Sequence, residues 1–421
     1  MKVIQVIPYL RLESSGPTQS VPGMCRGLQH AGCEVTLHSD GPAPNRDFGC
    51  PTTFHEIKVF PHPKFLRSPA MLKQLKAECQ TAQIIHNNSL WAFPNVYPLW
   101  AIKGTACKQV LQPRGTLSRW ALNNSKWKKR LFGWLFQYKV MCKADLWIAT
   151  CEEEYQDIRR LGYKQPVAIL PNGVDLPAFG KFGGEEFSVF PMALPRAHMQ
   201  SLEQRGCDCV DSNKQRQTAN DEQLTDAPRR RRMFFLSRIH PKKNVELLLR
   251  CWAKVEPQFP EWDLSIVGPD KNNSYADEMK QLAKDLGCQR VIFEGELNGE
   301  EKYRFMAESE CEVLPTHSEN FGMVVAEALA CKTPVICSYG APWSGLNDHK
   351  CGWWVPTTED AFLNAMTEAM SKTRAELSQM GERGREWMSR DFSWDGIGAK
   401  MKAAYAWLLG QGEKPDFVRV D

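Results

Sequence analysis

Short apolar runs alternate with longer segments of helical character in the first half of the chain. The runs have the length of buried strands, and the segment Val21–His30, after the first of them, is expected to be a helix. Strands separated by helices are typical of a parallel, doubly wound sheet, so we predict an α/β domain over residues 1–177. The expected strands are Val3–Ile7, Glu34–His38, Gln83–His86, Gln109–Leu111 and Leu146–Ala149, and Ala168–Asp175 closes the set with a Pro-Asn-Gly turn.

A second alternating set begins at Met233 and predicts a second α/β domain over residues 233–394. Two such halves make a two-domain protein with a cleft between the domains. The last helical stretch, Ile397–Leu409, lies in the remaining segment 395–421, and the pattern alone does not say which domain it packs on. The expected strands of the second set are Met233–Leu236, Leu264–Val267, Val291–Phe293, Val313–Leu314 and Pro334–Cys337.

The alternation stops over residues 178–232, between the two domains. The central part, Gln200–Ala227, is polar and poor in branched apolar residues, so it buries too little apolar surface to order itself. We therefore expect a polar and largely flexible insert. It ends in the run Arg229–Arg232, for which a solvated linker is favoured over contact with acidic lipid or a substrate phosphate.

Length and composition narrow the class of protein. A chain of 421 residues has room for two or three domains, and a net charge of +4 suggests no polyanionic partner such as a nucleic acid. Met1 runs directly into the first strand without a leader, and no apolar run approaches the roughly eighteen residues of a membrane span. Fifteen scattered cysteines fit a reducing compartment, so a cytoplasmic protein is expected. Cys207 and Cys209 with His198 are a weak metal pattern, because no second pair accompanies them.

Two carboxylates in the C-terminal third are the strongest candidates for chemistry. Glu319 and Glu327 stand eight residues apart and bracket Gly322 and an apolar helical stretch. In a strand–loop–helix unit, the loop and the helix start lie at the carboxyl edge of the sheet, where open α/β folds bind ligands. A separation of roughly 12 Å suits two polyol ends of one elongated ligand. Small residues around Glu327 indicate that it is buried and needs a partner, whereas solvated surface glutamates are the alternative.

A basic loop directly follows the first strand of the second domain. It contains Arg238 and Lys243, five residues apart, and precedes a helix expected over Val245–Lys254. Free backbone N–H groups and the helix dipole favour a phosphate at such a position. Alone, the loop is equally well interpreted as a solvated basic turn. Together with Glu319 and Glu327 on the same edge, a diphosphate site is favoured.

The combination of these motifs resembles the retaining glycosyltransferases of the GT-B fold, family 4 (group 1), of the type that builds bacterial surface polysaccharides. The resemblance covers nearly the whole chain apart from the insert. It implies two Rossmann-like domains that face a cleft: an acceptor-side first domain and a nucleotide-sugar-binding second domain, with the last helix crossing back to the first. The matching segments are Ser237–Lys243, Glu319–Glu327, Pro171–Asp175, Gly268–Asp270, Phe293–Gly295 and Arg390–Trp394.

The resemblance also implies a reaction and its residues: transfer of a hexose from a UDP- or GDP-sugar, without a cofactor. Arg238 and Lys243 are expected to hold the donor diphosphate, and Glu327 the ribose hydroxyls. Glu319 is expected to contact the transferred sugar and to act in catalysis with the two cations. Metal independence is expected, because the chain lacks the Asp-x-Asp motif that usually holds a metal in the GT-A fold. The expected donor-binding residues are Gly16, Arg238, Lys243, Glu319, Asn320, Phe321, Gly322, Met323, Val324 and Glu327.

The acceptor side is marked by fewer residues. Arg114 stands where many family members carry a histidine, and it is expected to contact an acceptor or phosphate oxygen. His86, at the end of an expected strand, is a second candidate for the cleft, with a satisfied structural histidine as an equal alternative. The basic and aromatic segment 125–136 is typical of a helix on an anionic membrane, slightly favoured over a core helix with a cationic end. It suggests a lipid-linked saccharide acceptor and a peripheral position on the inner face of the plasma membrane.

Three other functions are weighed against sugar transfer in polysaccharide or lipopolysaccharide biosynthesis. A nucleotide-sugar epimerase on the same fold would need further acid–base residues in the cleft, and no convincing set is found. A non-catalytic nucleotide- or glycan-binding scaffold would be favoured by loss of the motif residues, but Arg238, Lys243, Glu319 and Glu327 are all present. A nicotinamide dehydrogenase is disfavoured, because no Gly-x-Gly-x-x-Gly follows either first strand.

Overall fold

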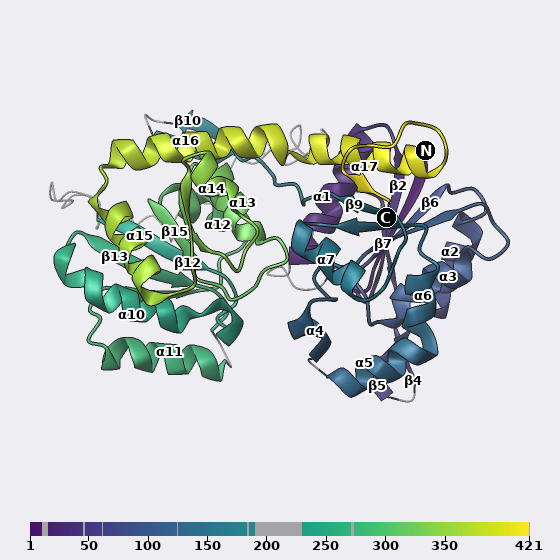
Figure 1. The fold of residues 1–421 in the computed structure, drawn as a ribbon, viewed down its shortest axis with the longest axis horizontal. Coiled ribbons are helices and arrows are strands. Elements are labelled where there is room, and N and C mark those ends of the chain that lie inside the picture. Colours follow the sequence, from purple (N-terminus) through teal and green to yellow (C-terminus); the bar gives the residue numbers. More distant parts are fainter. Residues whose placement is uncertain are drawn as a thin grey trace, which may run out of the picture.

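Two α/β domains stand side by side in the computed structural model, each a sheet covered by helices (Figure 1). The structure describes residues 1–10, 16–44, 47–60, 62–123, 125–182, 185–189, 230–270 and 273–420. The weak metal pattern at His198, Cys207 and Cys209 lies outside the described residues, and so do residues 190–229 of the expected insert.

The sheet of the first domain has eight strands in the order β18-β9-β8-β7-β6-β1-β2-β3. Neighbouring strands are parallel except for β18 and β9, so the predicted doubly wound parallel sheet is confirmed. The hydrophobic pattern did not predict β3 or β18, because both are short edge strands without a continuous apolar run. The strands are β1 (Lys2–Ile7), β2 (Glu34–Asp40), β3 (Thr52–His55), β6 (Ile84–Asn88), β7 (Lys108–Gln112), β8 (Leu146–Ala149), β9 (Val167–Ile169) and β18 (Val418–Arg419).

Helices cover both faces of this sheet, because alternate residues of its central strands point to opposite sides. On β8, Ile148 packs with α1 and α17, whereas Trp147 packs with α6 and α7. The helices are α1 (Gly16–His30), α2 (Pro69–Glu78), α3 (Tyr97–Ala101), α4 (Arg119–Asn123), α5 (Lys126–Phe132), α6 (Tyr138–Cys142), α7 (Glu152–Arg160) and α17 (Trp394–Leu408), with the helical turns η1 (Phe93–Asn95) and η2 (Gly133–Gln137). A separate antiparallel pair is formed by β4 (Lys58–Phe60) and β5 (His62–Arg67).

The sheet of the second domain is entirely parallel, in the order β14-β13-β12-β15-β16-β17. The chain adds strands on one side of β12 and then reverses to add them on the other, starting with β15. Such a switch point leaves a crevice at the carboxyl ends of the two central strands. The loops after β12 and β15 carry Arg238, Lys243 and Glu319, so the strand order brings these three residues to one crevice. The strands are β12 (Arg231–Leu236), β13 (Trp262–Val267), β14 (Val291–Gly295), β15 (Cys311–Leu314), β16 (Val335–Ser338) and β17 (Gly352–Val355).

Helices cover the second sheet as well, and one large apolar core joins them to it. In α10, the apolar positions Val245, Leu248, Leu249 and Trp252 recur at helical spacing, and all are buried. The helices are η3 (Pro241–Lys243), α10 (Val245–Val255), η4 (Glu256–Gln258), α11 (Ser274–Asp285), α12 (Gly299–Ala307), α13 (Met323–Ala330), α14 (Gly345–Asp348), α15 (Glu359–Ser371) and α16 (Arg374–Asp391).

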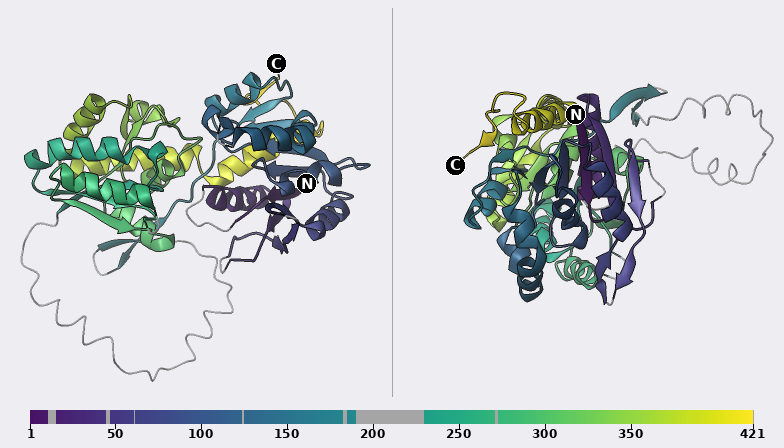
Figure 2. Two further views of the ribbon diagram at one scale, coloured as in Figure 1. Left: turned by 90° about the horizontal axis from the view of Figure 1, so that it is seen from below. Right: turned by 90° about the vertical axis from the view of Figure 1, so that its right-hand side faces the viewer.

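The C-terminal helices connect the two domains. From α16, on the second domain, the chain runs directly into α17, which lies beside α1 of the first domain (Figures 1 and 2). The two helices approach closely at Gly27 and Gly398, where a Cβ on either glycine would come within 2.2 Å of the backbone of the other helix. Ile397, Met401 and Tyr405 of α17 complete the core of the first domain. This crossing sets where the two cleft walls stand relative to each other.

Both ends of the segment 178–232 differ from the expected insert. β10 (Ala178–Phe182) and β11 (Glu185–Val189) pair as an antiparallel hairpin, which backbone hydrogen bonds form without a run of branched apolar residues. At the other end, β12 already begins at Arg231. Arg230 pairs with Asp263 (2.7 Å between Nε and Oδ2), and the Arg231 guanidinium lies 4.1 Å from the centre of the Trp262 ring. Arg231 is therefore part of the second sheet rather than of a solvated linker, and the exposed Arg230 lies beside it with its side chain on β13.

Candidate functional site

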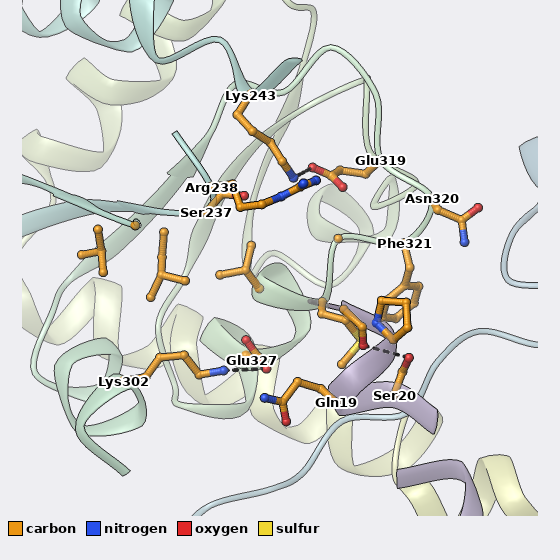
Figure 3. A pocket seen from close by; sticks show the side chains of 18 of the residues that line it. Gln19, Ser20, Ser237, Arg238, Lys243, Lys302, Glu319, Asn320, Phe321 and Glu327 are labelled. Carbon is orange, nitrogen blue, oxygen red and sulfur yellow. Dashed lines mark hydrogen bonds and ion pairs between the residues drawn. The ribbon is translucent and has the colours of Figure 1, made fainter. Parts of the chain in front are cut away.

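A cavity of about 400 Å³ lies between the two domains, at the switch point of the second sheet (Figure 3). The first domain contributes the start of α1 and the loop after β7. The second contributes the loops after β12, β14 and β15 and the helices α12 and α13. All ten residues expected on the donor side line this cavity, and so does Arg114. His86 does not line it.

Two cations from the loop after β12 meet a carboxylate from the loop after β15. Lys243 forms an ion pair with Glu319, and both side chains are largely buried. Figure 3 shows the Arg238 side chain pointing toward the same pair. The backbone N–H of His317 donates to the carbonyl of Lys242 (2.9 Å), so the two loops are fixed to each other. The site therefore presents positive charge on a rigid frame.

The N-terminus of α13 faces the same cavity. Its N-cap residue, Gly322, has a φ of +79°, a conformation that glycine adopts without strain. No side chain caps this helix, so the N–H groups of its first turn, at Met323 and Val324, are available to an anion. Trp343 holds the turn from behind, since its Nε1–H donates to the carbonyl of Phe321 (2.5 Å).

Glu327 is buried in α13, with 5% of its surface exposed. Its carboxylate accepts a hydrogen bond from Lys302 Nζ (2.8 Å; Figure 3). It also accepts one from the Tyr303 hydroxyl (3.3 Å), which lies on α12 as Lys302 does. The expectation that a buried Glu327 has a partner is confirmed. Burial, reinforced by the Glu327 carboxylate, raises the pKa of Tyr303 well above its usual range, so this phenol stays a hydrogen-bond donor.

Sequence reasoning missed Lys302. It lies in a helix with charged residues on several sides, and no spacing rule separates it from the exposed Glu300 and Glu301. The one available signal is its position four residues before the buried Met306, which places it on the face of α12 that packs inward.

Arg114 lies on the first-domain wall of the cavity with its guanidinium almost surrounded by neutral oxygen atoms. It donates to Asn88 Oδ1 from Nη2 (2.9 Å), and from Nη1 to Ser20 Oγ (2.9 Å) and Asn172 Oδ1 (3.3 Å). Burial lowers its pKa to about 10, and the nearby Glu154 carboxylate partly offsets the effect. A cation held by neutral partners retains attraction for an incoming anion.

The placement of His86 on the acceptor side of the cleft is wrong. Its side chain is fully buried in β6, and its Nδ1 lies 2.5 Å from the Tyr405 hydroxyl of α17. Burial, together with the positive charge of Arg114, lowers its pKa to about 3, so the imidazole is neutral. His86 is instead a structural histidine, because β6 is a central strand and its residues face helices on both sides.

Asn320 reaches across to the first domain. Its Nδ2 donates to Thr150 Oγ1 (2.6 Å), and its carbonyl accepts from Cys151 Sγ (3.2 Å). Glu154 accepts from the backbone N–H of Gly115 (2.6 Å), next to Arg114, and from that of Thr150 (2.8 Å). Asn320 was expected on the donor side; it lines the cavity, but its amide joins the two walls.

Lys242 is a further cavity residue that sequence reasoning did not single out. Its ammonium lies 5.1 Å from the centre of the Trp120 ring on α4, and the ring of His240 lies 6.2 Å from the same indole. Burial lowers the pKa of Lys242. These contacts are a second bridge between the domains, beside the cavity that Lys242 lines.

Beneath the site, Glu312 on β15 is fully buried. Burial, reinforced by the carboxylates of Glu327 and Glu319, raises its pKa well above the usual range. In the unfolded chain Glu312 ionises near its ordinary pKa, so the folded protein loses stability as the pH rises through the raised value.

Glu312→Gln is therefore expected to raise the melting temperature by a few degrees at pH 8 and to change it little at pH 5. The neutral amide has the same shape and carries no charge that burial opposes. Melting curves of parent and variant between pH 5 and pH 9 check this, with Glu301→Gln on the surface of α12 as a control. A difference that stays constant with pH would contradict a protonated Glu312.

Two protein-family models match the chain. The model described as Glycosyl transferases group 1 matches residues 216–387, and the model described as Glycosyltransferase Family 4 matches residues 15–177. This chain belongs to the group 1 glycosyltransferases. The region matched by the group 1 model contains Lys243, Glu319 and Glu327, and the region matched by the Family 4 model contains Arg114. Both matched regions therefore contribute to the cavity.

Curated relatives match this chain over only part of their length. The GDP-mannose-dependent alpha-(1-6)-phosphatidylinositol monomannoside mannosyltransferase of Mycolicibacterium smegmatis is 30% identical over 177 residues, 39% of this chain and 45% of the relative. The alpha-1,3/1,6-mannosyltransferase alg2 of Schizosaccharomyces pombe is 24% identical over 201 residues, 41% of this chain and 40% of the relative. The chain thus spans less than half the length of these relatives.

Solved structures are similar to the chain over nearly all of its length. Sucrose-phosphate synthase from Thermosynechococcus elongatus has a TM-score of 0.67 at 20% identity and covers 97% of this chain and 99% of its own. The complex of Anabaena Alr3699/HepE with UDP-glucose has a TM-score of 0.66 at 15% identity, with the same coverage of 97% and 99%. At these identities the likeness concerns the fold, and the expected GT-B fold is confirmed.

Proposed function

We propose that this chain is a retaining glycosyltransferase that moves a sugar from a UDP- or GDP-sugar to a saccharide acceptor carried by a lipid. One observation carries the proposal: two cations, an uncapped helix N-terminus and a buried carboxylate line a single cavity between the domains. The cations and the helix N-terminus suit a diphosphate, and the carboxylate suits the ribose hydroxyls. No smaller ligand would use all of them at once.

The diphosphate is the leaving group, which takes the electron pair of the broken sugar–oxygen bond. Arg238 offers it a planar fork of N–H donors, and Lys243 a compact ammonium. Preorganised charges and N–H dipoles of this kind stabilise negative charge as it develops. Lys243 is already held in place by Glu319, so an arriving phosphate meets a cation whose position is set.

The ribose is assigned to Glu327. A carboxylate accepts two hydroxyl hydrogen bonds in the geometry of a vicinal diol, and Lys302 and Tyr303 keep this one oriented. Glu319 pairs with Lys243 and directly precedes Asn320, which contacts the first domain, so its position suits contact with the sugar being transferred. The arrangement positions the donor along the cavity with its sugar toward Arg114.

The cavity lining favours retention of configuration. An inverting displacement needs a general base beside the acceptor hydroxyl. Among the described residues that line the cavity there is no histidine or aspartate, and Glu319 and Glu327 are ion-paired with lysines. The third carboxylate, Glu296, comes from the loop after β14 in the donor-side domain. The departing phosphate oxygen is then the best proton acceptor, on the same face as the arriving hydroxyl.

The comparisons support the choice of substrates. A relative is named as GDP-mannose-dependent and as acting on a phosphatidylinositol monomannoside, and a structure of the same fold was solved with UDP-glucose. A nucleotide-sugar epimerase is a weaker candidate, although a putative UDP-N-acetylglucosamine 2-epimerase from Listeria monocytogenes shares the fold with a TM-score of 0.58 at 10% identity. Its acid–base chemistry would need a set of unpaired carboxylates or histidines, whereas the described lining contains no histidine and Glu296 is its one carboxylate outside the two ion pairs with lysines.

Release of nucleoside diphosphate tests the proposed transfer. The chain is incubated in EDTA with UDP-glucose, UDP-N-acetylglucosamine or GDP-mannose and a bacterial lipid extract as acceptor. We expect extract-dependent release from one of these donors, with the sugar recovered in the lipid fraction. Activity abolished by EDTA and restored by Mg²⁺ would contradict metal independence, and donor binding without any release would favour a non-catalytic scaffold.

Membrane contact is proposed at the segment 125–136 and its continuation. Within the described residues, no helix is both long and apolar enough to cross a bilayer. Instead, α5, η2 and the start of α6 expose an apolar stripe at helical spacing: Trp127, Leu131, Trp134, Leu135 and Tyr138. The opposite side of the same helical segment packs against the core through the partly buried Phe132 and Phe136. Exposed aromatic residues beside lysines and arginines are typical of a helix that lies in an anionic membrane surface.

A flotation assay checks this contact. The chain is expected to float with liposomes that contain anionic lipid and to stay behind with purely zwitterionic ones. Trp127→Ser with Trp134→Ser replaces the two most exposed of the five stripe residues, which are 67% and 76% exposed, and is expected to abolish flotation. If the parent chain does not float with anionic liposomes, the proposed membrane contact is wrong.

A further inference from the structure

A second cavity, of about 820 Å³, lies wholly within the first domain. It is formed by the loop before α4, by α4, α5 and α6, and by the turn after α7. Buried Leu117 and Met141 make part of an apolar floor. We call it the basic groove, because five cations and no carboxylate appear among its described lining residues: Arg119, Lys126, Lys129, Arg130 and Arg160.

Four of these cations, all except Arg160, have no ion pair within the described part of the chain. Arg160 donates to Asp157 Oδ1 (2.7 Å), and Lys129 donates to the carbonyl of Ala121. Arg119, Lys126 and Arg130 are exposed and have neither a carboxylate nor a carbonyl partner among the described residues. Several unneutralised cations around one cavity attract an anion, and two guanidinium groups match a phosphate in particular.

The apolar stripe adjoins the basic groove, because its residue Tyr138 also lines the groove. Lys126 and Arg130 of the groove are on α5, each next in sequence to a stripe residue, Trp127 and Leu131. An anion held in the groove therefore has exposed apolar surface directly beside it. A ligand that uses both features has a phosphate group joined to a hydrocarbon chain, which describes a phospholipid or a lipid phosphate rather than a free ion.

The basic groove also adjoins the cavity between the domains. One loop, after β7, lines both: Arg114 and Gly115 face the interdomain cavity, whereas Leu117 and Arg119 face the groove. The next residue, Trp120, contacts Lys242, which lines the interdomain cavity. A molecule anchored in the groove has only this loop to cross before it reaches Arg114.

We infer that the basic groove binds the phosphate or diphosphate group of the lipid-linked acceptor. The lipid chain then follows the apolar stripe into the membrane, and the saccharide crosses the loop after β7 toward Arg114. The identity of the bound lipid as the acceptor rests on the proposed function. The presence of a lipid-phosphate site in the first domain does not depend on it.

Calorimetric titration of the full chain with monomeric dihexanoyl phosphatidic acid tests the site, with dihexanoyl phosphatidylcholine and inorganic phosphate as comparison ligands. The double variant Lys126→Gln/Arg130→Gln removes two groove charges. The matched control, Lys128→Gln/Lys139→Gln, removes two exposed charges from the same helical segment outside the groove. We expect phosphatidic acid to bind best and the groove variant to weaken its binding about tenfold or more, while the control changes it less than about twofold.

Three results would overturn the inference. Equal weakening in both double variants would show only general surface charge, and equal binding of inorganic phosphate would show a free-anion site. Loss of phosphatidic acid binding in Lys243→Ala, with the groove variant unaffected, would place the lipid phosphate in the interdomain cavity instead. Because no nucleotide is present, none of these results bears on donor binding. Failure of the donor assay with groove binding intact would instead count against the proposed function.

Discussion

Replacing Lys243 with alanine is expected to lower the turnover of sugar transfer by about two to three orders of magnitude, the usual effect of losing one preorganised donor at a developing negative charge. Lys243 and Arg238 supply the positive charge that meets the departing diphosphate, and within the described ranges Lys243 is the cation that forms an ion pair with Glu319. The turnover number and the Michaelis constant for the donor, measured separately, check this expectation. Turnover should fall much more than donor affinity.

A second variant separates two causes of that loss. Without Lys243, the largely buried Glu319 has no partner and repels a phosphate. The double variant Lys243→Ala/Glu319→Gln lacks this repulsion. Any activity that it regains relative to Lys243→Ala therefore measures how much of the loss the repulsion causes. Lys284→Ala, an exposed lysine on α11, is the control and should behave as the parent chain. Near-normal turnover in Lys243→Ala would overturn the assignment of the diphosphate to this loop.

Glu327 is expected to determine donor affinity rather than turnover. Its replacement removes hydrogen bonds from a charged acceptor to two ribose hydroxyls, which corresponds to a loss of about 10- to 100-fold in the dissociation constant of the nucleoside diphosphate. Calorimetric titration measures this directly. Since Glu327 is also the partner of the buried Lys302, alanine would leave an unpaired charge and threaten folding.

Two designs keep the Glu327 experiment interpretable. Glu327→Gln retains the size of the side chain and one acceptor for Lys302. Glu327→Ala/Lys302→Met removes both charges at once, so the folded state keeps no unpaired ion. Both are expected to bind nucleoside diphosphate weakly, whereas Glu301→Gln on the exposed face of α12 should bind as the parent does. Tight binding by both Glu327 variants would contradict the ribose assignment.

The architecture was predictable because parallel strands buried on both faces leave continuous apolar runs in the sequence, as in Ile84–Ile85 and Leu146–Ala149. The loops after β12 and β15 were predictable for the same reason, since they follow such runs and carry charged residues. Short edge strands such as β3 and the hairpin of β10 and β11 have no such runs. Their backbone pairing leaves little trace in the order of hydrophobic residues.

Partnerships between distant segments were not predictable from spacing. The pairing of Lys302 with Glu327 joins residues of two helices, and the contact of Asn320 with Thr150 joins two domains. His86 illustrates the same limit: a histidine after an apolar strand suits a cleft or a core, and only the crossing of α17 places Tyr405 against it. Local sequence does not record which element covers a given face.

The central claim is that the interdomain cavity binds a nucleoside diphosphate without a metal ion. Thermal unfolding of the chain in EDTA with UDP, GDP, ADP or NAD tests it most directly, because a ligand that binds only the folded state raises the melting temperature. We predict that either UDP or GDP raises it by several degrees, and that the rise is lost in Glu327→Gln. No rise with any of the four, or an equal rise in the variant, would contradict the assignment.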